Sequence, residues 1–190
     1  MSAMLAAGEA IERLIAKIAL AAGWLFVACT GVIVFDVVTR KFGYQLPGFG
    51  STRLQELEWH LHTAIFSLWL GMAYVKNAHV RIDVALRGAS LRTQAWMELA
   101  GCIVFALPYC LVALYFSADY AWIAWTYNEA SISASGLSYR FIPKGVLSFG
   151  FLLLLAGIVS VMLRSGVYLF GPETLRERSA FAGVKRRGAE

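Results

Sequence analysis

Four long stretches of the chain contain no aspartate, glutamate, lysine or arginine, and they constrain the fold more than any other feature. They comprise residues 18–35, 59–75, 99–118 and 145–163, and charged residues gather in the segments between them. A run of roughly 17 to 25 mostly apolar residues can cross the hydrocarbon core of a bilayer as one helix. A soluble fold of 190 residues could not bury four such stretches. The pattern therefore predicts an all-α integral membrane protein with four transmembrane helices.

Charges and turn-forming residues set the expected limits of these helices. We expect one four-helix transmembrane domain at 18–170, followed by a basic tail at 171–190. Pro108 lies near the middle of the third helix and is expected to kink it. Gly171 is followed directly by a proline, which ends the last helix. The four helices are predicted at about 18–38, 54–75, 95–125 and 144–170.

Residues 1–17 precede the first apolar stretch and have a helical pattern of their own. Apolar residues such as Leu5 and Ile11 alternate with charged residues such as Glu9 and Glu12. This spacing is typical of an amphipathic helix that lies on a membrane surface. A plain cytoplasmic extension of the first membrane helix fits the same residues, and the sequence leaves both interpretations open.

Lysine and arginine residues lie mainly on one side of the predicted topology. The amino-terminal segment, the loop between the second and third helices and the carboxy-terminal tail contain eleven of them, whereas the two opposite loops contain five. Loops rich in lysine and arginine stay in the cytoplasm, so both termini are predicted to be cytoplasmic. The same distribution explains the net charge of +5 without nucleic acid, whose binding needs a basic face on a folded surface.

The three histidines are the first candidates for a cofactor site, because a membrane helix bundle can hold haem. Axial ligation by two histidines needs them on facing helices at one depth. His60, His62 and His79 all lie on or just after the predicted second helix, and the other three helices contain none. This distribution argues against haem within a single chain.

A metal site at the start of the second helix is the other candidate. Glu58 and His62 are four residues apart, as are Glu56 and His60, so each pair shares a helix face. A catalytic zinc site needs a third ligand and a polar cavity. We therefore favour the interpretation that these polar residues lie at the membrane interface and cap the helix.

Acidic residues are missing from the middle of every predicted span. Glu98 and Asp119, for example, flank the third apolar stretch rather than interrupting it. A small proton-coupled exporter needs an ionisable group within the membrane. The absence of such a group favours an accessory or scaffolding role.

The segment 54–84 reads LQELEWHLHTAIFSLWLGMAYVKNAHVRIDV. It contains Glu58 near the start of the predicted second helix, Gly71 thirteen residues later, and His79 and Asp83 in a His-x-x-x-Asp sequence after the helix. This pattern resembles the small membrane subunit, the DctQ-type subunit, of tripartite ATP-independent periplasmic (TRAP) transporters. The opening of this string is similar to the mannitol/chloroaromatic-type branch of the family.

The loop that follows the third helix adds to the resemblance. It contains Glu129, Arg140 and Lys144, similar to the polar connection of the same branch. It departs from that pattern at Ser135, where a glycine is expected. The resemblance extends from the first helix to the end of the fourth.

The resemblance implies a function without catalysis. A DctQ-type subunit works with a large permease of the DctM type and a periplasmic binding protein of the DctP type, in the inner membrane of a bacterial cell. Together they import organic acids (carboxylates), driven by sodium. The small subunit is expected to be a multi-pass scaffold for the large permease and to help dock the binding protein. It is expected to bind no cofactor, metal or substrate itself.

Six residues are candidates for structural or subunit contacts under this resemblance. Glu58 could pair with a cation of a neighbouring helix or of the large permease. For His79 and Asp83, capping of the loop and a subunit contact both remain open. The basic loop that contains them is expected to attract anionic lipid headgroups. The candidates are Glu58, Gly71, His79, Asp83, Arg140 and Lys144.

Two interpretations also remain open for Gly71 and for the pair Arg140 and Lys144. Arg140 and Lys144 belong either to a contact with the binding protein or to an ordinary solvated loop. Gly71 permits close helix packing, against a helix of this chain or of the permease. For the chain as a whole, the alternative function is a membrane anchor of an electron-transfer complex that holds haem or quinone.

Overall fold

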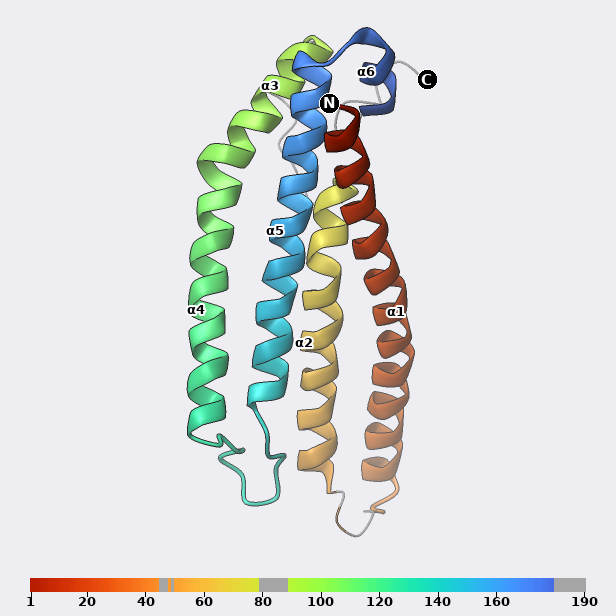
Figure 1. Ribbon diagram of the computed structural model, residues 1–190. Coiled ribbons are helices and arrows are strands. Elements are labelled where there is room, and N and C mark those ends of the chain that lie inside the picture. The colour runs from red at the N-terminus through yellow and green to blue at the C-terminus, as the bar shows by residue number, and fades with distance from the viewer. Residues whose placement is uncertain (45–47, 49, 79–88, 180–190) are drawn as a thin grey trace. The chain divides into compact units, whose positions relative to one another are not determined.

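The computed structural model describes residues 1–44, 48, 50–78 and 89–179, and every regular element within them is helical. No strand occurs in these residues, so the predicted all-α class is confirmed. The helices in chain order are α1 (Ser2–Lys41), α2 (Ser51–Val75), α3 (Leu91–Gly101), the π-helix η2 (Cys102–Ala106), α4 (Leu107–Thr126), α5 (Phe141–Phe170) and α6 (Glu173–Ser179) (Figure 1).

Three helical stretches in the described residues are long and apolar enough to cross a membrane. They are α1, α5 and the stretch Leu91–Thr126, which runs through α3, η2 and α4. The helix α2 is not among them, because its first half contains three charged side chains and two histidines. The fourth crossing and the cytoplasmic position of both termini therefore stay predictions.

The helix α1 is longer than expected, since it begins at Ser2 and runs without interruption to Lys41. No helix boundary separates residues 1–17 from the first apolar stretch. This continuity agrees with the interpretation of residues 1–17 as a plain extension of the first membrane helix. Leu5 and Ile15 are buried, so one face of this extension packs against protein.

The helices α2 and α5 also begin slightly earlier than expected, at Ser51 and Phe141. In α5 the early start places Pro143 in the first turn. Proline is tolerated there because backbone N–H groups in a first turn have no partner within the helix.

The third predicted helix is interrupted near Pro108, and the interruption is a turn of π-helix. The N–H group of Leu107 bonds to the carbonyl of Cys102, five residues earlier. Proline cannot donate a hydrogen bond, and its ring collides with the carbonyl four residues before it. The wider π-turn accommodates both effects. At the start of α3, the Ser90 side chain caps the helix by accepting a bond from the Thr93 N–H.

The chain forms two compact units. The first contains Met1–Lys17, Leu70–Val112 and Leu152–Glu190, and the second contains Ile18–Trp69 and Ala113–Phe151. Each unit includes part of α1, of α2, of α4 and of α5. The core of the first unit contains Cys102, Cys110, Ile158 and Val161.

The helices α2 and α5 touch closely within each unit. In the first unit, a Cβ atom added at Gly71 would lie 2.6 Å from the carbonyl oxygen of Leu153. In the second unit, a Cβ atom at Gly150 would lie 2.5 Å from the carbonyl oxygen of Ser67. Because the obstructing atoms are backbone, only glycine fits at these positions. Gly71 therefore packs against a helix of its own chain.

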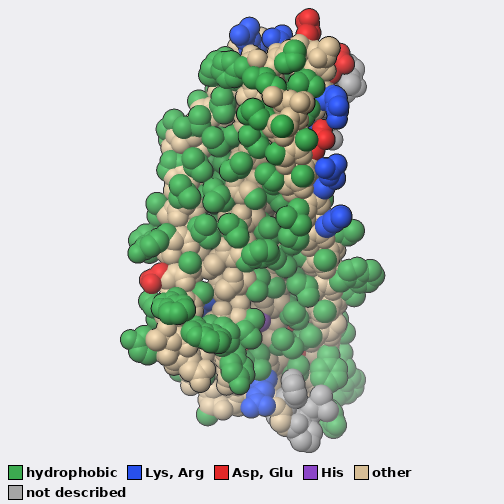
Figure 2. Space-filling view, in the orientation of Figure 1, with side chains coloured by type: hydrophobic (Ala, Val, Ile, Leu, Met, Phe, Trp, Pro, Cys, Tyr) green, Lys and Arg blue, Asp and Glu red, His purple; other side chains and the backbone are tan. Residues whose placement is uncertain are grey.

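Large apolar side chains lie on the outside of the helices rather than inside. Trp24 and Phe105 are each 74% exposed, and Figure 2 shows hydrophobic side chains over most of the face in view. Soluble proteins rarely expose apolar patches of this extent. These surfaces are suited to contact with lipid or with another membrane protein.

Candidate functional site

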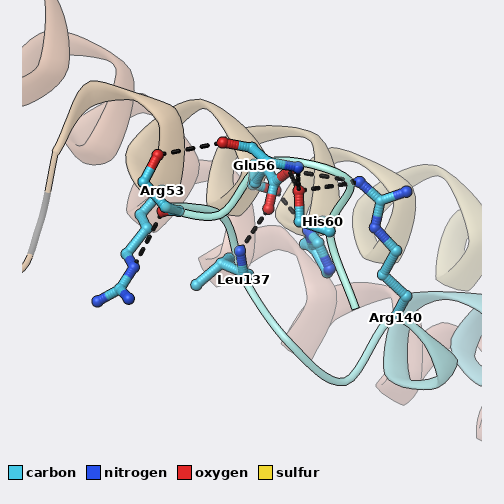
Figure 3. A network of polar contacts seen from close by, with 8 residues as sticks. Arg53, Glu56, His60, Leu137 and Arg140 are labelled. Atoms are coloured by element: carbon cyan, nitrogen blue, oxygen red, sulfur yellow. Dashed lines mark hydrogen bonds and ion pairs between the residues drawn. The ribbon is translucent and has the colours of Figure 1, made fainter. Parts of the chain in front are cut away.

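Glu56 is the centre of a polar network that joins the start of α2 to the loop between α4 and α5 (Figure 3). Its side chain is 11% exposed. The atom Oε2 accepts a hydrogen bond of 2.5 Å from the backbone N–H of Leu137. The atom Oε1 accepts one from the Ser131 hydroxyl and one of 3.3 Å from Nη2 of Arg140. Three donors from one loop therefore converge on a single carboxylate.

Arg53 makes a second connection between α2 and the same loop. Its Nε donates to the carbonyl of Ser135 at 3.1 Å, and its Nη1 donates to the carbonyl of Gly48 at 2.5 Å. The loop is also closed on itself, because the N–H of Arg140 bonds to the carbonyl of Glu129 at 3.1 Å. These contacts hold the loop against the first turns of α2.

The Glu56 carboxylate is stabilised in its charged form. It precedes the uncharged stretch 59–75, the part of α2 expected to lie in the membrane. Burial disfavours its charge, but the hydrogen bonds from Ser131 and Leu137 and the positive charge of Arg140 outweigh that effect. Together they hold the pKa of the Glu56 carboxyl below its usual value.

Arg140 and Lys144, both predicted from the sequence, lie at this network and already have partners in the chain. The guanidinium carbon of Arg140 lies 5.7 Å from the centre of the Trp59 ring. The ammonium group of Lys144 pairs with Glu129 and lies 3.6 Å from the centre of the Tyr120 ring. The Lys144 side chain is only 11% exposed. Both cations thus fix the loop to the helices around it.

The other predicted residues lie elsewhere. Glu58 is two residues after Glu56, so its side chain leaves α2 roughly 160° away and does not join the network. Gly71 lies in the first unit, at the contact between α2 and α5. His79 and Asp83 lie outside the described residues.

The structure gives Glu56 a contact that neither the favoured interfacial cap nor the alternative metal site predicts. Its spacing to His60 suggested a pair of metal ligands, but Nδ1 of His60 instead bonds to the backbone carbonyl of Glu56. Among the described residues, no group of three or more histidine, cysteine, aspartate or glutamate side chains could hold a metal ion. Helical spacing alone does not reveal the loop that approaches Glu56.

A second polar network lies in the first unit and was not anticipated. Nη1 of Arg164 lies 2.6 Å from Oε2 of Glu12, which pairs α5 with the extension of α1. Between them, the buried hydroxyl of Ser160 contacts Oε1 of Glu12 at 2.9 Å and the carbonyl of Gly8 at 3.1 Å. Nη2 of Arg164 also bonds to the carbonyl of Arg178 at 3.2 Å.

The chain with Ser160→Ala is expected to lose about 1 kcal/mol of stability, since the hydroxyl is fully buried and links two helices. Ser148→Ala is the matched control, because within the described residues the Ser148 hydroxyl donates to the Lys144 carbonyl of its own helix and to no other helix. Thermal unfolding in detergent measures both. If both substitutions lower the unfolding temperature equally, the hydrogen bonds from Ser160 to α1 do not contribute to stability.

Comparison with protein families gives the identity of the chain. Residues 29–166 match the family described as "Tripartite ATP-independent periplasmic transporters, DctQ component". No curated protein and no solved structure matches the chain. The match is to a family of transporter components rather than of enzymes, and it lends no support to an electron-transfer anchor. Because it includes most of the chain and agrees with the helical, apolar structure, the protein belongs to the DctQ component family of TRAP transporters.

Proposed function

We propose that this chain is the small permease subunit of a sodium-coupled TRAP transporter that imports organic acids across the bacterial inner membrane. The match to the DctQ component over residues 29–166 is the observation that carries the proposal. The partners implied by the family are a large permease of the DctM type and a binding protein of the DctP type.

The proposed task of the subunit is to scaffold the large permease. The exposed apolar side chains on its helices, such as Trp24 and Phe105, provide surface for that contact. Charged groups form pairs that fix helices and loops in place. Asp36 and Arg40, for example, lie 2.8 Å apart near the end of α1. Such pairs support a structural role for this chain, with substrate and sodium bound by the permease.

The loop between α4 and α5 is the proposed contact for the periplasmic binding protein. The predicted topology places it on the periplasmic side. The Glu56 network holds it against α2, while Tyr127 and Ile132 are 80% and 97% exposed. A fixed loop that presents apolar side chains to water is suited to docking a partner. On the opposite side of the predicted topology, His79 and Asp83 stay candidates for a subunit contact, in a basic loop that would attract anionic lipids.

The first test is purification of the tagged chain from its own membranes in mild detergent. We expect a large polytopic permease to co-purify in roughly equal amounts. Proteoliposomes that contain both subunits should then take up an organic acid only with an inward sodium gradient and the binding protein. Recovery of the chain alone, or uptake at the same rate without it, would contradict the proposal.

A further inference from the structure

A cavity lies between α1 and α2 in the second unit, on the side of α2 away from the Glu56 network. Its volume is about 360 Å³. Its lining includes Cys29 and Ile33 from α1 and Glu58, His62 and Phe66 from α2. One face of the cavity is therefore apolar, and the other contains a carboxylate.

One oxygen of the Glu58 carboxylate in this cavity is unsatisfied within the described chain. Its Oε1 is buried and has no hydrogen-bond partner there, whereas the Glu56 carboxylate accepts three hydrogen bonds. A buried acceptor without a partner is costly, and a buried charge without a counter-charge is more so. Oε1 of Glu58 therefore lacks a partner among the described residues and can accept one from another molecule.

Three of the polar groups that line the cavity contact acceptors other than this carboxylate. The Cys29 thiol contacts the backbone carbonyl of Glu58 at 3.7 Å rather than its carboxylate. The Thr63 hydroxyl donates to the carbonyl of Trp59 at 2.8 Å. The remaining amide donor in the lining, on Gln55, contacts the Ser51 hydroxyl at 3.1 Å.

We propose that the Glu58 cavity receives an arginine or lysine side chain of the large permease, which rests on the proposed function above. The carboxylate would pair with the cationic head of that side chain, and Ile33 and Phe66 would cover its methylene stem. Charges near a membrane are found paired with one another. A helix of the permease can hold such a side chain at a fixed depth, which a mobile lipid ammonium group cannot do.

Glu58→Gln tests the proposal, because it removes the charge and keeps the shape. The tagged chain is co-expressed with its large permease, and recovery of the permease is measured in detergent. We expect Glu58→Gln to lower recovery about tenfold. Asp119→Asn, which removes an exposed carboxylate from α4 of the same unit, should leave recovery unchanged. The chain expressed alone should be at least as stable with Glu58→Gln as without it, since Oε1 has no partner to lose among the described residues and the substitution removes an uncompensated charge.

The partner side chain is identified by cross-linking. A photoreactive amino acid at position 62 should cross-link to a permease segment that contains arginine or lysine. Glu58→Arg combined with reversal of that basic residue to glutamate should restore recovery. A cross-link to a segment without basic residues would contradict the assignment.

The possible failures are distinguishable. If the unmodified chain recovers no permease, the proposed function fails. If it recovers permease and Glu58→Gln recovers as much, the cavity proposal alone fails. Native mass spectrometry would expose a different occupant: loss of a bound phosphatidylethanolamine with Glu58→Gln, while permease recovery is unchanged, would assign the cavity to a lipid and overturn the proposal.

Discussion

Gly71→Ala is expected to destabilise the chain by about 1–3 kcal/mol, although alanine is the better helix former. The added Cβ atom would lie 2.6 Å from the carbonyl oxygen of Leu153 and 2.9 Å from its carbonyl carbon. Backbone atoms cannot rotate away, so α2 and α5 must move apart at this contact. The expected result is a lower unfolding temperature of the purified chain in detergent, measured by size-exclusion chromatography after heating.

The control for this prediction is Gly31→Ala in α1. A Cβ atom at Gly31 meets nothing within 4 Å, so only the helical preference of alanine acts there. That preference should raise stability by up to about 1 kcal/mol. If both variants shift the unfolding temperature in the same direction, the close contact at Gly71 does not control stability.

Much of the secondary structure follows from hydrophobicity and proline placement. The four uncharged stretches predict helices because a backbone in lipid must satisfy its own hydrogen bonds. The interruption beside Pro108 follows from the donor that proline lacks. The helix α2 is less apolar than the other three stretches, because the polar residues that build the site also lower its hydropathy.

The tertiary partners of the charged residues could not be read from the sequence. Glu56 and Arg140 are 84 positions apart, and Glu12 and Arg164 are 152 positions apart. Helical periodicity relates a residue only to neighbours three or four positions away. The choice between Glu56 and Glu58 as the centre of the network depends on the face of α2 that meets the loop, which only packing determines.

The family resemblance identified the correct protein class but described the site incompletely. It pointed to Glu58, Arg140 and Lys144, of which only the two cations belong to the loop network. From its sequence position, Glu56 is expected to be an interfacial cap, with a metal ligand as the alternative. In the structure its two oxygens accept hydrogen bonds from the loop between α4 and α5. A carboxylate near the start of a helix can thus act as a clamp, a side chain that holds a distant loop in place.

Glu56→Ala is expected to release the loop between α4 and α5. The substitution leaves the N–H of Leu137 without its acceptor and the guanidinium of Arg140 without its carboxylate partner. Removing one partner of a buried ion pair costs about 3–5 kcal/mol, and the exposure of Arg140, 22% of its side chain, reduces the expected cost to about 2–4 kcal/mol. Trypsin cleavage after Arg140 should become at least tenfold faster, because locally opened states become more populated.

Glu129→Gln is the matched control for this release, since Glu129 pairs with a cation of the same region but is 35% exposed. A glutamine at this position can still accept a hydrogen bond from Lys144, and a partly exposed pair contributes less than a buried one, so cleavage should change much less than with Glu56→Ala. A double-mutant cycle of Glu56→Ala with Arg140→Met isolates the ion pair from the hydrogen bonds to Ser131 and Leu137. Unfolding temperatures measure the cycle, because Arg140→Met removes the trypsin site. If the stability losses of the two single variants do not add up to that of the double variant, the ion pair between Glu56 and Arg140 itself helps to hold the loop. If the losses are additive and Glu56→Ala leaves the cleavage rate unchanged, the loop is held by Arg53 and its own backbone bonds, and Glu56 is not the clamp.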